Sequence, residues 1–299
     1  MQFDGKVVIV TGSGGGLGRS HALDFARRGA RVVVNDLGGA VDGSGGSSDA
    51  AEAVVAEIKD FGGEAISNGS SVSDRAGVAQ LVKDAMDAYG RIDVLVNNAG
   101  VLRDRTFAKM TLDDFDFVSQ VHLQGAAYCS HAVWPIMRDQ AYGRIVMTSS
   151  SSGIYGNFGQ ANYGAAKMAQ AGLANTLKLE GGKYNIRVNT LVPIATTRMT
   201  EDLFPDGFKE LFDPTLVTPA VVFLASEDAP TGVIICAGAG HYSAAQMVET
   251  EGFTVGEGAK AEDIAANWEA ISGGAQTHYE SGGPQTQKFG MAAMAKKNG

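Results

Sequence analysis

The chain has 299 residues and a formal net charge of −9, because 33 Asp and Glu outnumber 24 Lys and Arg. This balance argues against a nucleic-acid-binding protein, which needs a basic surface for phosphate. A hydrophobic content of 44% is too high for a disordered chain, and no apolar run approaches the roughly 18 residues that cross a membrane.

Short β-rich runs alternate with helix-length segments over the first 240 residues. The runs are almost continuously apolar, as in strands buried on both faces of a sheet, and lie at Lys6–Thr11, Arg31–Asn35, Ala65–Ser67, Asp93–Val96, Arg144–Thr148, Arg187–Leu191 and Val233–Cys236. Helices are predicted at Leu17–Gly29, Ser48–Phe61, Asp74–Tyr89, Thr111–Arg138, Ala161–Tyr184 and Thr218–Ser226. Right-handed β-α-β crossovers then predict an α/β fold, a Rossmann-type doubly wound parallel sheet of seven strands with helices on both faces.

Two segments fall outside this alternation. Gly38–Ser48 is rich in glycine and serine and is expected to form a flexible surface loop. Residues 241–299 form a C-terminal extension with one predicted helix, Ala261–Ile271, and a loop around Gly273–Gly283. The extension is expected to pack on the main domain, residues 1–240, or on a partner subunit.

The first predicted strand runs directly into a glycine-rich turn that precedes a predicted helix, Thr11-Gly12-Ser13-Gly14-Gly15-Gly16-Leu17-Gly18. Glycines let the backbone approach a ligand without a Cβ in the way, and a helix N-terminus offers free N–H groups and a positive dipole end to a pyrophosphate. A glycine motif between strand and helix therefore predicts dinucleotide binding by the main domain. The residues expected at the cofactor are Gly12, Ser13, Gly16, Leu17 and Gly18.

Asp36 ends the second predicted strand. A carboxylate there can accept hydrogen bonds from both hydroxyls of an adenosine ribose, and it would repel a 2′-phosphate. At about 4 Å and an effective dielectric of roughly 20, one charge pair contributes up to about 4 kcal/mol. The sequence therefore predicts NAD rather than NADP, although Arg19 leaves partial use of NADP open.

Tyr163 and Lys167 are spaced i, i+4 in a predicted helix and therefore lie on one face. A tyrosine with a pKa near 10 is about 0.1% ionised at pH 7, and a nearby ammonium or oxidised nicotinamide favours its phenolate. Tyr163 can then act as a general base in alcohol oxidation or as a general acid in ketone reduction. Ser150 follows a strand at the edge where such sheets bind ligands, so its hydroxyl can orient the substrate oxygen. The predicted catalytic residues are Ser150, Tyr163 and Lys167.

Four motifs in this order resemble the short-chain dehydrogenase/reductase family: the glycine turn, Asn97-Asn98-Ala99-Gly100, Ser150 and Tyr163-x-x-x-Lys167. The resemblance implies that Asn98, Ala99 and Gly100 lie along the cofactor. It also implies that Lys167, next to Tyr163, holds the nicotinamide ribose. The further cofactor contacts that it implies are Ser71, Val72, Pro193, Ile194 and Thr197.

Three positions depart from the family pattern. His122 stands where most members have Asn, so it either relays protons near pH 6.5 or is a helix residue bonded to backbone. Ser70-Ser71-Val72 stands where Asp-Val commonly reads the adenine amino group, which weakens that contact. Ile194 replaces the usual Gly after Pro193 and crowds the nicotinamide pocket.

Longer stretches resemble the branch of the family that oxidises (3R)-hydroxyacyl-CoA thioesters, among them Asn35-Asp36-Leu37-Gly38-Gly39 and Ser152-Gly153-Ile154-Tyr155-Gly156. The expected function is therefore an NAD-dependent alcohol dehydrogenase that interconverts such a secondary alcohol and its ketone. Arg103, Arg105 and Lys109 either meet the phosphates of CoA or are solvated loop charges.

The alternative substrate is a steroid such as estradiol, because Thr196–Phe212 could line an apolar cleft. The apolar residues of that segment, which an ordinary covering helix would also carry, are Met199, Leu203, Phe204, Phe208, Leu211 and Phe212. A third possibility, a non-enzymatic NAD sensor, is disfavoured because the three predicted catalytic residues are all present.

The expected partners are a small-molecule substrate and a second copy of the chain, without nucleic acid or membrane. The family commonly pairs through long helices such as Thr111–Arg138 and Ala161–Tyr184, so a homodimer is expected and a homotetramer is possible. No signal peptide is recognisable and the last residues are not the peroxisomal signal Ser-Lys-Leu, so a cytoplasmic location is expected. Cys129 and Cys236 show no metal-ligand spacing with the five histidines, which predicts no metal site.

Overall fold

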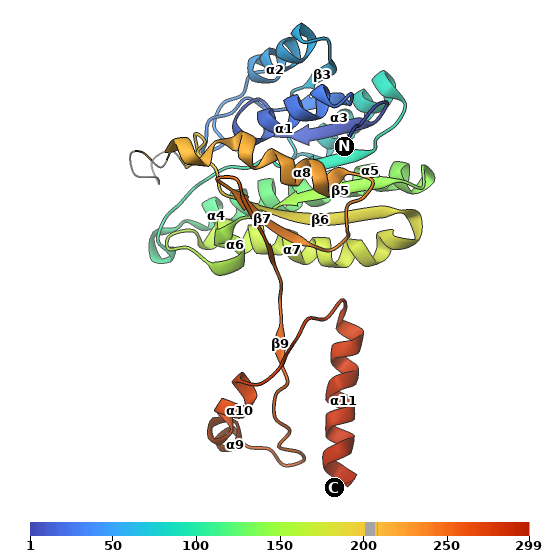
Figure 1. Ribbon diagram of the computed structural model, residues 1–299. Coiled ribbons are helices and arrows are strands. Elements are labelled where there is room, and N and C mark those ends of the chain that lie inside the picture. Colours follow the sequence, from blue (N-terminus) through green and yellow to red (C-terminus); the bar gives the residue numbers. More distant parts are fainter. Residues whose placement is uncertain (201–206, 208, 299) are drawn as a thin grey trace. The chain divides into compact units, whose positions relative to one another are not determined.

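The computed structural model describes residues 1–200, 207 and 209–298. The chain divides into two compact units, Met1–Ala244 and Ala245–Gly299. In the first unit, helices surround a central sheet (Figure 1).

The sheet has eight strands in the order β3-β2-β1-β4-β5-β6-β7-β8. They are β1 Val7–Thr11, β2 Arg31–Asn35, β3 Glu64–Asn68, β4 Val94–Asn97, β5 Gly143–Thr148, β6 Ile186–Pro193, β7 Ile234–Gly238 and β8 His241–Ala245. Every pairing from β1 to β7 is parallel. The predicted doubly wound α/β fold is confirmed.

The predicted number of seven strands is wrong, because β8 extends the sheet by one. Positive φ angles at Ala239 (49°) and Gly240 (72°) turn the chain back beside β7. β8 is almost fully exposed and carries no apolar run, so hydrophobic patterning could not reveal it.

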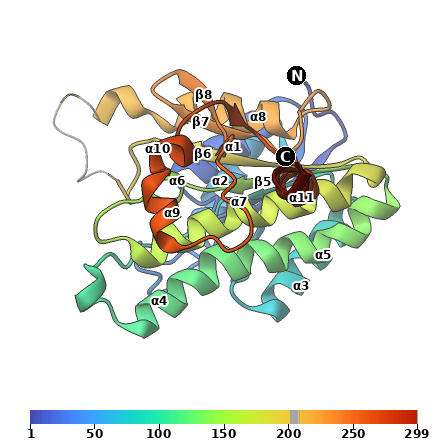
Figure 2. The ribbon, with the colours of Figure 1, turned by 90° about the horizontal axis from the view of Figure 1, so that it is seen from below.

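The helices of the first unit cover both faces of the sheet. They are α1 Gly16–Arg27, α2 Asp49–Asp60, α3 Arg75–Tyr89, α4 Leu112–Ser119, α5 Gly125–Asp139, α6 Ser151–Tyr155, α7 Ala161–Gly181 and α8 Thr218–Ala225. Alternate residues of β1 point to opposite faces. Val8 and Val10 enter the core beneath α1, α2 and α8, whereas Val7 and Ile9 enter the core beneath α3, α5 and α7. Figure 2 shows α5 and α7 running side by side.

The predicted helix Thr111–Arg138 is not uniform. A π-helical turn, Gln120–Gln124, separates α4 from α5, and His122 lies in this turn. Such turns frequently occur at functional sites. The short helix α6 was not predicted. Ser150 is its N-cap, and the Ser150 Oγ accepts a hydrogen bond from the Ser152 backbone N–H at 3.2 Å.

The glycine-rich segment Gly38–Ser48 is anchored rather than detached. Its Val41 carbonyl accepts a hydrogen bond from the Leu102 N–H at 2.9 Å. A Cβ on Gly43 would lie 2.7 Å from the ring of Phe117. The loop therefore packs closely on α4 and on the segment after β4, which the sequence did not reveal.

The second unit contains a two-stranded antiparallel sheet of β9 Glu249–Thr250 and β10 Gln276–Thr277. The predicted helix Ala261–Ile271 is broken at Asn267 into α9 Ala261–Ala266 and α10 Trp268–Ser272. A further helix, α11 Gly282–Asn298, was not predicted. Its first residues include two glycines and a proline, which are typical of loops.

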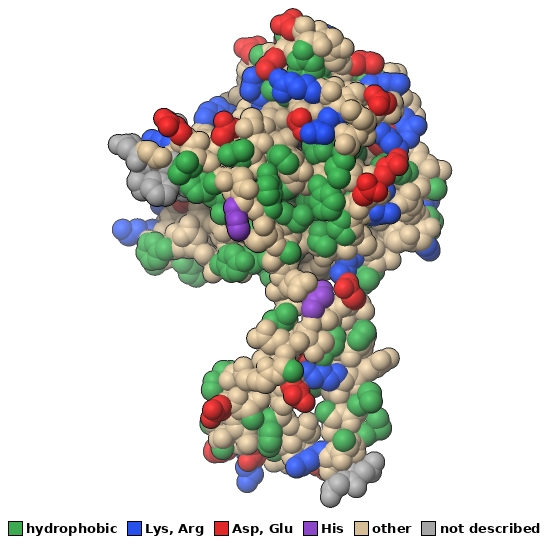
Figure 3. Space-filling model, viewed as in Figure 1, with side chains coloured by type: hydrophobic (Ala, Val, Ile, Leu, Met, Phe, Trp, Pro, Cys, Tyr) green, Lys and Arg blue, Asp and Glu red, His purple; other side chains and the backbone are tan. Residues whose placement is uncertain are grey.

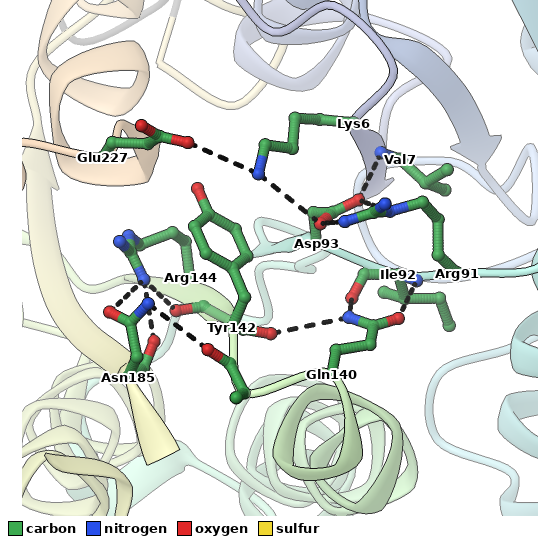
Figure 4. A network of polar contacts seen from close by, with 12 residues as sticks. Lys6, Val7, Arg91, Ile92, Asp93, Gln140, Tyr142, Arg144, Asn185 and Glu227 are labelled. Atoms are coloured by element: carbon green, nitrogen blue, oxygen red, sulfur yellow. Dashed lines mark hydrogen bonds and ion pairs between the residues drawn. The ribbon is translucent and has the colours of Figure 1, made fainter. Parts of the chain in front are cut away.

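A polar network closes the edge of the sheet where β1, β4, β5 and β6 begin (Figure 4). Asp93 is completely buried and accepts hydrogen bonds from the Val7 N–H at 2.9 Å and from two nitrogens of Arg91 at 2.6 and 2.7 Å. The ring of Tyr142 lies 3.7 Å from Lys6 Nζ and 4.3 Å from the Arg144 guanidinium carbon. This network, called here the amino edge, joins the starts of four strands.

The surface drawn in Figure 3 carries interspersed acidic and basic side chains on the first unit. No helix in the described part of the chain is long and apolar enough to cross a membrane. The same residues contain no group of three or more His, Cys, Asp or Glu positioned to hold a metal ion.

Candidate active site

The carboxyl ends of the central strands surround a cavity of about 430 Å³. It is lined by all but one of the predicted site residues: Gly12, Gly16, Leu17, Gly18, Asp36, Ser71, Val72, Asn98, Ala99, Gly100, Ser150, Tyr163, Lys167, Pro193, Ile194 and Thr197. The exception is Ser13, which is buried and donates through Oγ to the Val10 carbonyl at 2.7 Å. Ser13 stabilises the turn from beneath and does not line the cavity.

The glycine turn fits closely against its neighbours on one side and is open on the other. A Cβ on Gly12 would lie 2.7 Å from Ala99 Cα, and a Cβ on Gly18 would lie 2.2 Å from the Gly12 carbonyl oxygen. At Gly15, by contrast, the nearest atom would be an Arg198 nitrogen at 3.9 Å. Gly15 is the N-cap of α1 and provides no side chain for its first N–H groups. The turn is therefore a cradle whose open side can admit a phosphate group.

Asp36 joins the loops on either side of the cavity. Its two carboxylate oxygens accept hydrogen bonds from the Gly14 and Gly38 N–H groups, each at 2.7 Å. Arg19, which could have neutralised a phosphate nearby, forms an ion pair with Glu57. The carboxylate is thus fixed beside the glycine turn, and Arg19 is engaged elsewhere.

Asn98 connects the ends of β1 and β4. Its side-chain nitrogen donates to the Thr11 and Gly12 carbonyls at 2.9 and 3.0 Å, while its backbone N–H donates to Thr11 Oγ1 at 3.0 Å. These bonds hold the Asn98–Gly100 segment against the glycine turn.

Tyr163 and Lys167 lie on the face of α7 that lines the cavity. Tyr163 lies close enough to Ser150 for the serine side chain to lower the pKa of its hydroxyl. Lys167 is 3% exposed, lies 5.5 Å from the centre of the Tyr163 ring, and donates from Nζ to the Thr148 carbonyl at 2.5 Å. The three residues that the sequence selected therefore come together.

The acidity of this pair differs from the expectation. Burial raises the pKa of Tyr163 to about 12; the Ser150 side chain lowers it, and the carboxylate of Asp104 raises it. Burial also lowers the pKa of Lys167 to about 7. Both groups are pushed toward their neutral forms because a cavity that excludes water destabilises either charge. The lowered tyrosine pKa expected from the sequence is therefore not a property of the protein alone.

His122 is a neutral, backbone-bonded residue rather than a group that titrates near pH 6.5. It is 1% exposed, and burial first, then the charge of Lys167, hold its pKa well below 6.5. Its Nε2 lies 2.8 Å from the Val101 carbonyl oxygen and 3.1 Å from the Val101 nitrogen. Its ring meets Tyr163 edge-to-face at 5.1 Å. A Cβ on Gly100 would lie 2.3 Å from His122 Cε1, so this contact requires glycine there.

Several residues that support the site were not found from the sequence. Gln170, one turn beyond Lys167, donates to the His122 carbonyl at 2.7 Å. Gly153 lets α6 approach α7, because a Cβ there would lie 2.8 Å from Lys167 Cβ. Gln160 donates to Asp104 at 2.6 Å and accepts from Ser152 at 2.7 Å. Only the spacing of Gln170 from Lys167 left a signal in the sequence, and a core residue would show the same spacing.

The residues that the sequence placed near the substrate differ in their surroundings. Arg103 is engaged: it donates to the Asp42 carbonyl at 3.0 Å, pairs with Asp114 at 3.1 Å and lies 4.0 Å above the ring of Phe117. Arg105 and Lys109 are exposed. In the apolar segment, Met199 lines the cavity, Leu211 and Phe212 belong to a 3-10 turn, and Leu203, Phe204 and Phe208 lie outside the described residues.

Comparison with known proteins matches residues 6–207 to the family described as short chain dehydrogenase. A short-chain type dehydrogenase/reductase of Mycobacterium tuberculosis is 47% identical over 268 residues, which cover 89% of this chain and 94% of the relative. The peroxisomal multifunctional enzyme type 2 of Mus musculus is 49% identical over 275 residues, which cover 91% of this chain but 37% of that enzyme.

Solved structures agree with these relatives. The full-length peroxisomal multifunctional enzyme type 2 of Drosophila melanogaster superimposes with a TM-score of 0.85 and 37% identity, covering 100% of this chain and 51% of that one. A 7α-hydroxysteroid dehydrogenase complexed with NADH and 7-oxo glycochenodeoxycholic acid superimposes with a TM-score of 0.72 and 28% identity, covering 80% of this chain and 95% of that one.

The names of the relatives correct the expectation of a cytoplasmic protein. The mouse and fly relatives are named as peroxisomal enzymes, as are relatives in Dictyostelium discoideum and Saccharomyces cerevisiae. The expectation rested on the lack of a recognisable targeting signal, and such a lack does not define a compartment.

Proposed function

Since the chain belongs to the short-chain dehydrogenase family and is an oxidoreductase of the alcohol dehydrogenase type, we propose that it oxidises (3R)-hydroxyacyl-CoA thioesters to 3-ketoacyl thioesters with NAD. The observation that carries the proposal is the convergence of Ser150, Tyr163 and Lys167 on the cavity that also contains the open glycine turn. The resemblance to the hydroxyacyl-CoA branch supports the substrate, as do relatives named multifunctional enzymes.

The cradle fits a dinucleotide because its glycines leave room only where a ligand would enter. The open backbone at Gly15 can receive a pyrophosphate, and Asn98 to Gly100 line the same cavity. Lys167, Pro193, Ile194 and Thr197 line the same cavity as the catalytic tyrosine. These residues would hold the cofactor, which accepts a hydride when the alcohol is oxidised.

The choice of NAD rests on charge. Asp36 is fixed by the Gly14 and Gly38 N–H groups and would repel the 2′-phosphate of NADP. The ion pair of Arg19 with Glu57 removes the cation that could have offset this repulsion. The NADH in the structure of the similar hydroxysteroid dehydrogenase is consistent with the proposal.

Chemistry at the site needs one proton acceptor and one orienting group. Ser150 holds the substrate hydroxyl next to Tyr163, and Tyr163 removes its proton as the hydride leaves carbon. Tyr163 must be a phenolate to accept this proton, and the ammonium form of Lys167 stabilises that phenolate. The Nζ of Lys167 is held in position by the Thr148 carbonyl. In the reductive direction, Tyr163 returns the proton to the carbonyl oxygen.

A parallel assay tests the proposal. NADH formation from NAD is followed with (3R)-hydroxybutyryl-CoA, a longer (3R)-hydroxyacyl-CoA and 17β-estradiol. We expect turnover with the thioesters. Turnover confined to estradiol would contradict the acyl-CoA proposal and leave the oxidoreductase class intact.

A steroid is the second candidate substrate, because a structurally similar enzyme was solved with a steroid acid. Ionic strength separates the two substrates: the KM for a CoA thioester should rise with salt, whereas the KM for a neutral steroid should not. Replacing exposed Arg105 and Lys109 by Ala should raise the KM for the thioester severalfold if they meet CoA phosphates. Arg103 is left out of this test because it already pairs with Asp114.

We also propose a homodimer that pairs through α5 and α7. These helices expose a hollow with α3 that is lined mainly by apolar side chains, including Tyr128, Trp134, Leu173 and Leu177. Sedimentation of a monomer at micromolar concentration would contradict the dimer, and a tetramer would require a second interface.

A further inference from the structure

Asp104 begins a series of hydrogen bonds that ends at Ser150. Its Oδ2 accepts from Gln160 Nε2 at 2.6 Å, and Gln160 Oε1 accepts from Ser152 Oγ at 2.7 Å. The backbone N–H of Ser152 donates in turn to Ser150 Oγ at 3.2 Å. Gln160, Ser152 and Ser150 are all buried. Three bonds therefore connect Asp104, which does not line the cavity, to Ser150, which does.

The carboxylate at the start of this series fixes the direction of the bonds that follow. An ionised carboxylate accepts hydrogen bonds and donates none, so the Gln160 amide must turn its nitrogen toward Asp104 and its oxygen toward Ser152. The Ser152 hydroxyl must then donate, and Asn157 Nδ2 donates to the same Gln160 oxygen at 3.1 Å. Ser150 Oγ accepts from the Ser152 N–H, so its own proton can be donated to the oxygen of a bound substrate.

The residue before Asp104 braces the start of α7, which carries Tyr163. The Arg103 carbonyl accepts from Asn162 Nδ2 at 3.0 Å, and Asn162 Oδ1 accepts from the Tyr163 N–H at 2.7 Å. The Asn162 side chain is completely buried between them. The short segment that contains Asp104 is therefore bonded both to the residues that hold Ser150 and to the backbone of Tyr163.

One oxygen of the Asp104 carboxylate is left without a partner. Oδ1 is buried, and no group in the described part of the chain donates to it. A buried acceptor without a donor lowers the stability of the folded state, so its presence needs an explanation other than stability. The explanation we favour is the other oxygen, through which Asp104 orders the Gln160 amide.

Titratable groups surround Tyr163 from several elements. They are Lys167 on α7, His122 in the π-helical turn, Asp104 in the segment after β4, and the ion pair of Arg103 with Asp114 on α4. Burial and the charge of Lys167 keep His122 neutral, and the two charges of the ion pair offset each other. The ammonium form of Lys167 favours the Tyr163 phenolate, whereas the carboxylate of Asp104 raises the pKa of Tyr163.

We propose that Asp104 is a positioning residue that acts through Gln160 and Ser152 to orient the Ser150 hydroxyl toward the substrate oxygen. This inference rests on the proposed function, in which Ser150 holds that oxygen next to Tyr163. A group that reacts or orients must be held by supporting hydrogen bonds to within about 0.5 Å. A displacement of about 1 Å can lower a rate by about 100-fold, so a small change of direction in the series should affect turnover.

Steady-state kinetics of the full chain test this role, with NAD and (3R)-hydroxybutyryl-CoA. In Asp104→Asn the shape of the side chain is kept, but the new amide can donate as well as accept, so Gln160 can turn over and Ser152 loses its defined acceptor. The matched control is Asp113→Asn, at an exposed acidic residue in the first turn of α4. Melting temperatures are measured for every variant.

A double variant, Asp104→Asn with Gln160→Glu, restores the direction of the series. The carboxylate then stands at position 160, where it accepts from the amide at position 104, from Ser152 and from Asn157. A further variant, Ser152→Ala, removes the middle link and leaves Asp104 untouched. It keeps the test decisive if Asp104→Asn does not fold.

For Asp104→Asn and for Ser152→Ala we expect kcat to fall about tenfold, with the KM for NAD changed by less than about twofold. The double variant should recover most of the lost kcat, and Asp113→Asn should match the wild type. The pH profile of Asp104→Asn should also change. Loss of the carboxylate lowers the pKa of Tyr163, so the rise of the oxidation rate with pH should begin at a lower pH. A residue that only supports the fold would leave this profile unchanged.

Three results would overturn the positioning role. One is a kcat and a pH profile of Asp104→Asn that equal those of the wild type. Another is a loss of kcat that the double variant does not recover, which would mean that the direction of the hydrogen bonds is immaterial. The third is an unchanged kcat in Ser152→Ala. Failure of the proposed function appears separately, as a wild type that forms no NADH from the thioester.

Discussion

Buried polar groups at the two ends of the central strands differ in how completely their hydrogen bonds are satisfied. At the amino edge, the carboxylate of Asp93 is completely buried and fully engaged by Arg91 and the Val7 backbone. At the carboxyl edge, the groups around the cavity are incompletely satisfied: Thr148 Oγ1 and His122 Nδ1 are buried without a partner among the described residues.

The difference separates stability from chemistry. A polar group whose partners all come from the chain has nothing left to offer a ligand, so it contributes to the folded state. A polar group that is held in place but has an unused hydrogen-bond donor or acceptor can bind a ligand or react, at some cost in stability. Substitutions at the amino edge should therefore change unfolding and spare turnover, whereas those at the carboxyl edge should do the reverse.

The largest effect is expected from Tyr163→Phe. Loss of the hydroxyl that exchanges a proton with the substrate should lower kcat by about 10³- to 10⁴-fold in both directions. Binding of NADH and the melting temperature should stay close to wild type, because the ring is retained. Tyr155→Phe, on the exposed end of α6, is the matched control. Turnover that survives Tyr163→Phe would exclude the proposed mechanism.

At the amino edge, Asp93→Asn should reduce the free energy of unfolding by about 2–3 kcal/mol, since it weakens one buried and two partly buried hydrogen bonds and leaves Arg91 without its counter-charge. Urea denaturation measures this loss. The exposed pair of Lys83 and Asp87 provides the control, and Asp87→Asn should leave the urea midpoint unchanged. A fall in kcat without a fall in stability would contradict the division between the two edges.

Acid should weaken the fold through buried histidines. Burial lowers the pKa of His21 to about 3, whereas in the unfolded chain it is near 6.5. Between these values the unfolded state binds more protons, so stability is retained above pH 6.5 and lost as the pH falls below it. His21 alone should remove about 2 kcal/mol between pH 7.5 and pH 5.

Urea denaturation at the two pH values measures this term. His21→Asn should reduce the pH dependence, and His241→Asn, at an exposed position, should not. The same pH dependence in His21→Asn and in wild type would show that other groups cause the acid sensitivity.

The smallest effect is expected in the choice of cofactor. Asp36→Ala should narrow the preference for NAD over NADP by about tenfold, because the repulsion of the 2′-phosphate disappears. The ratio of kcat/KM for the two cofactors measures it. Asp42→Asn, in the same loop but outside the cavity lining, is the control. An unchanged ratio would mean that a residue other than Asp36 selects between NAD and NADP.

The placement of the site residues was predictable because it depends on short-range spacing. Tyr163 and Lys167 share a helical face, Ser150 follows a strand, and the glycine turn joins a strand to a helix; each pattern fixes local geometry wherever the chain folds. The supporting residues were not predictable. Gln170, Gly153 and Asp104 meet their partners only after α6, α7 and the segment after β4 have packed together.

The same distinction explains the errors in the fold. β8 lacks an apolar run, and α11 begins with residues that are typical of loops, so neither could be found from local preference. Both segments form regular secondary structure without the residue preferences that normally predict a strand or a helix.

Hydrophobic periodicity and residue spacing act within a few residues, so they were enough to predict the family, the α/β fold and a set of site residues that, except for Ser13, line one cavity. Three properties became known from the packed structure: His122 is held neutral, Arg103 pairs with Asp114, and Ser13 does not line the cavity. These properties depend on burial and on partners distant in the chain, and both are set by packing.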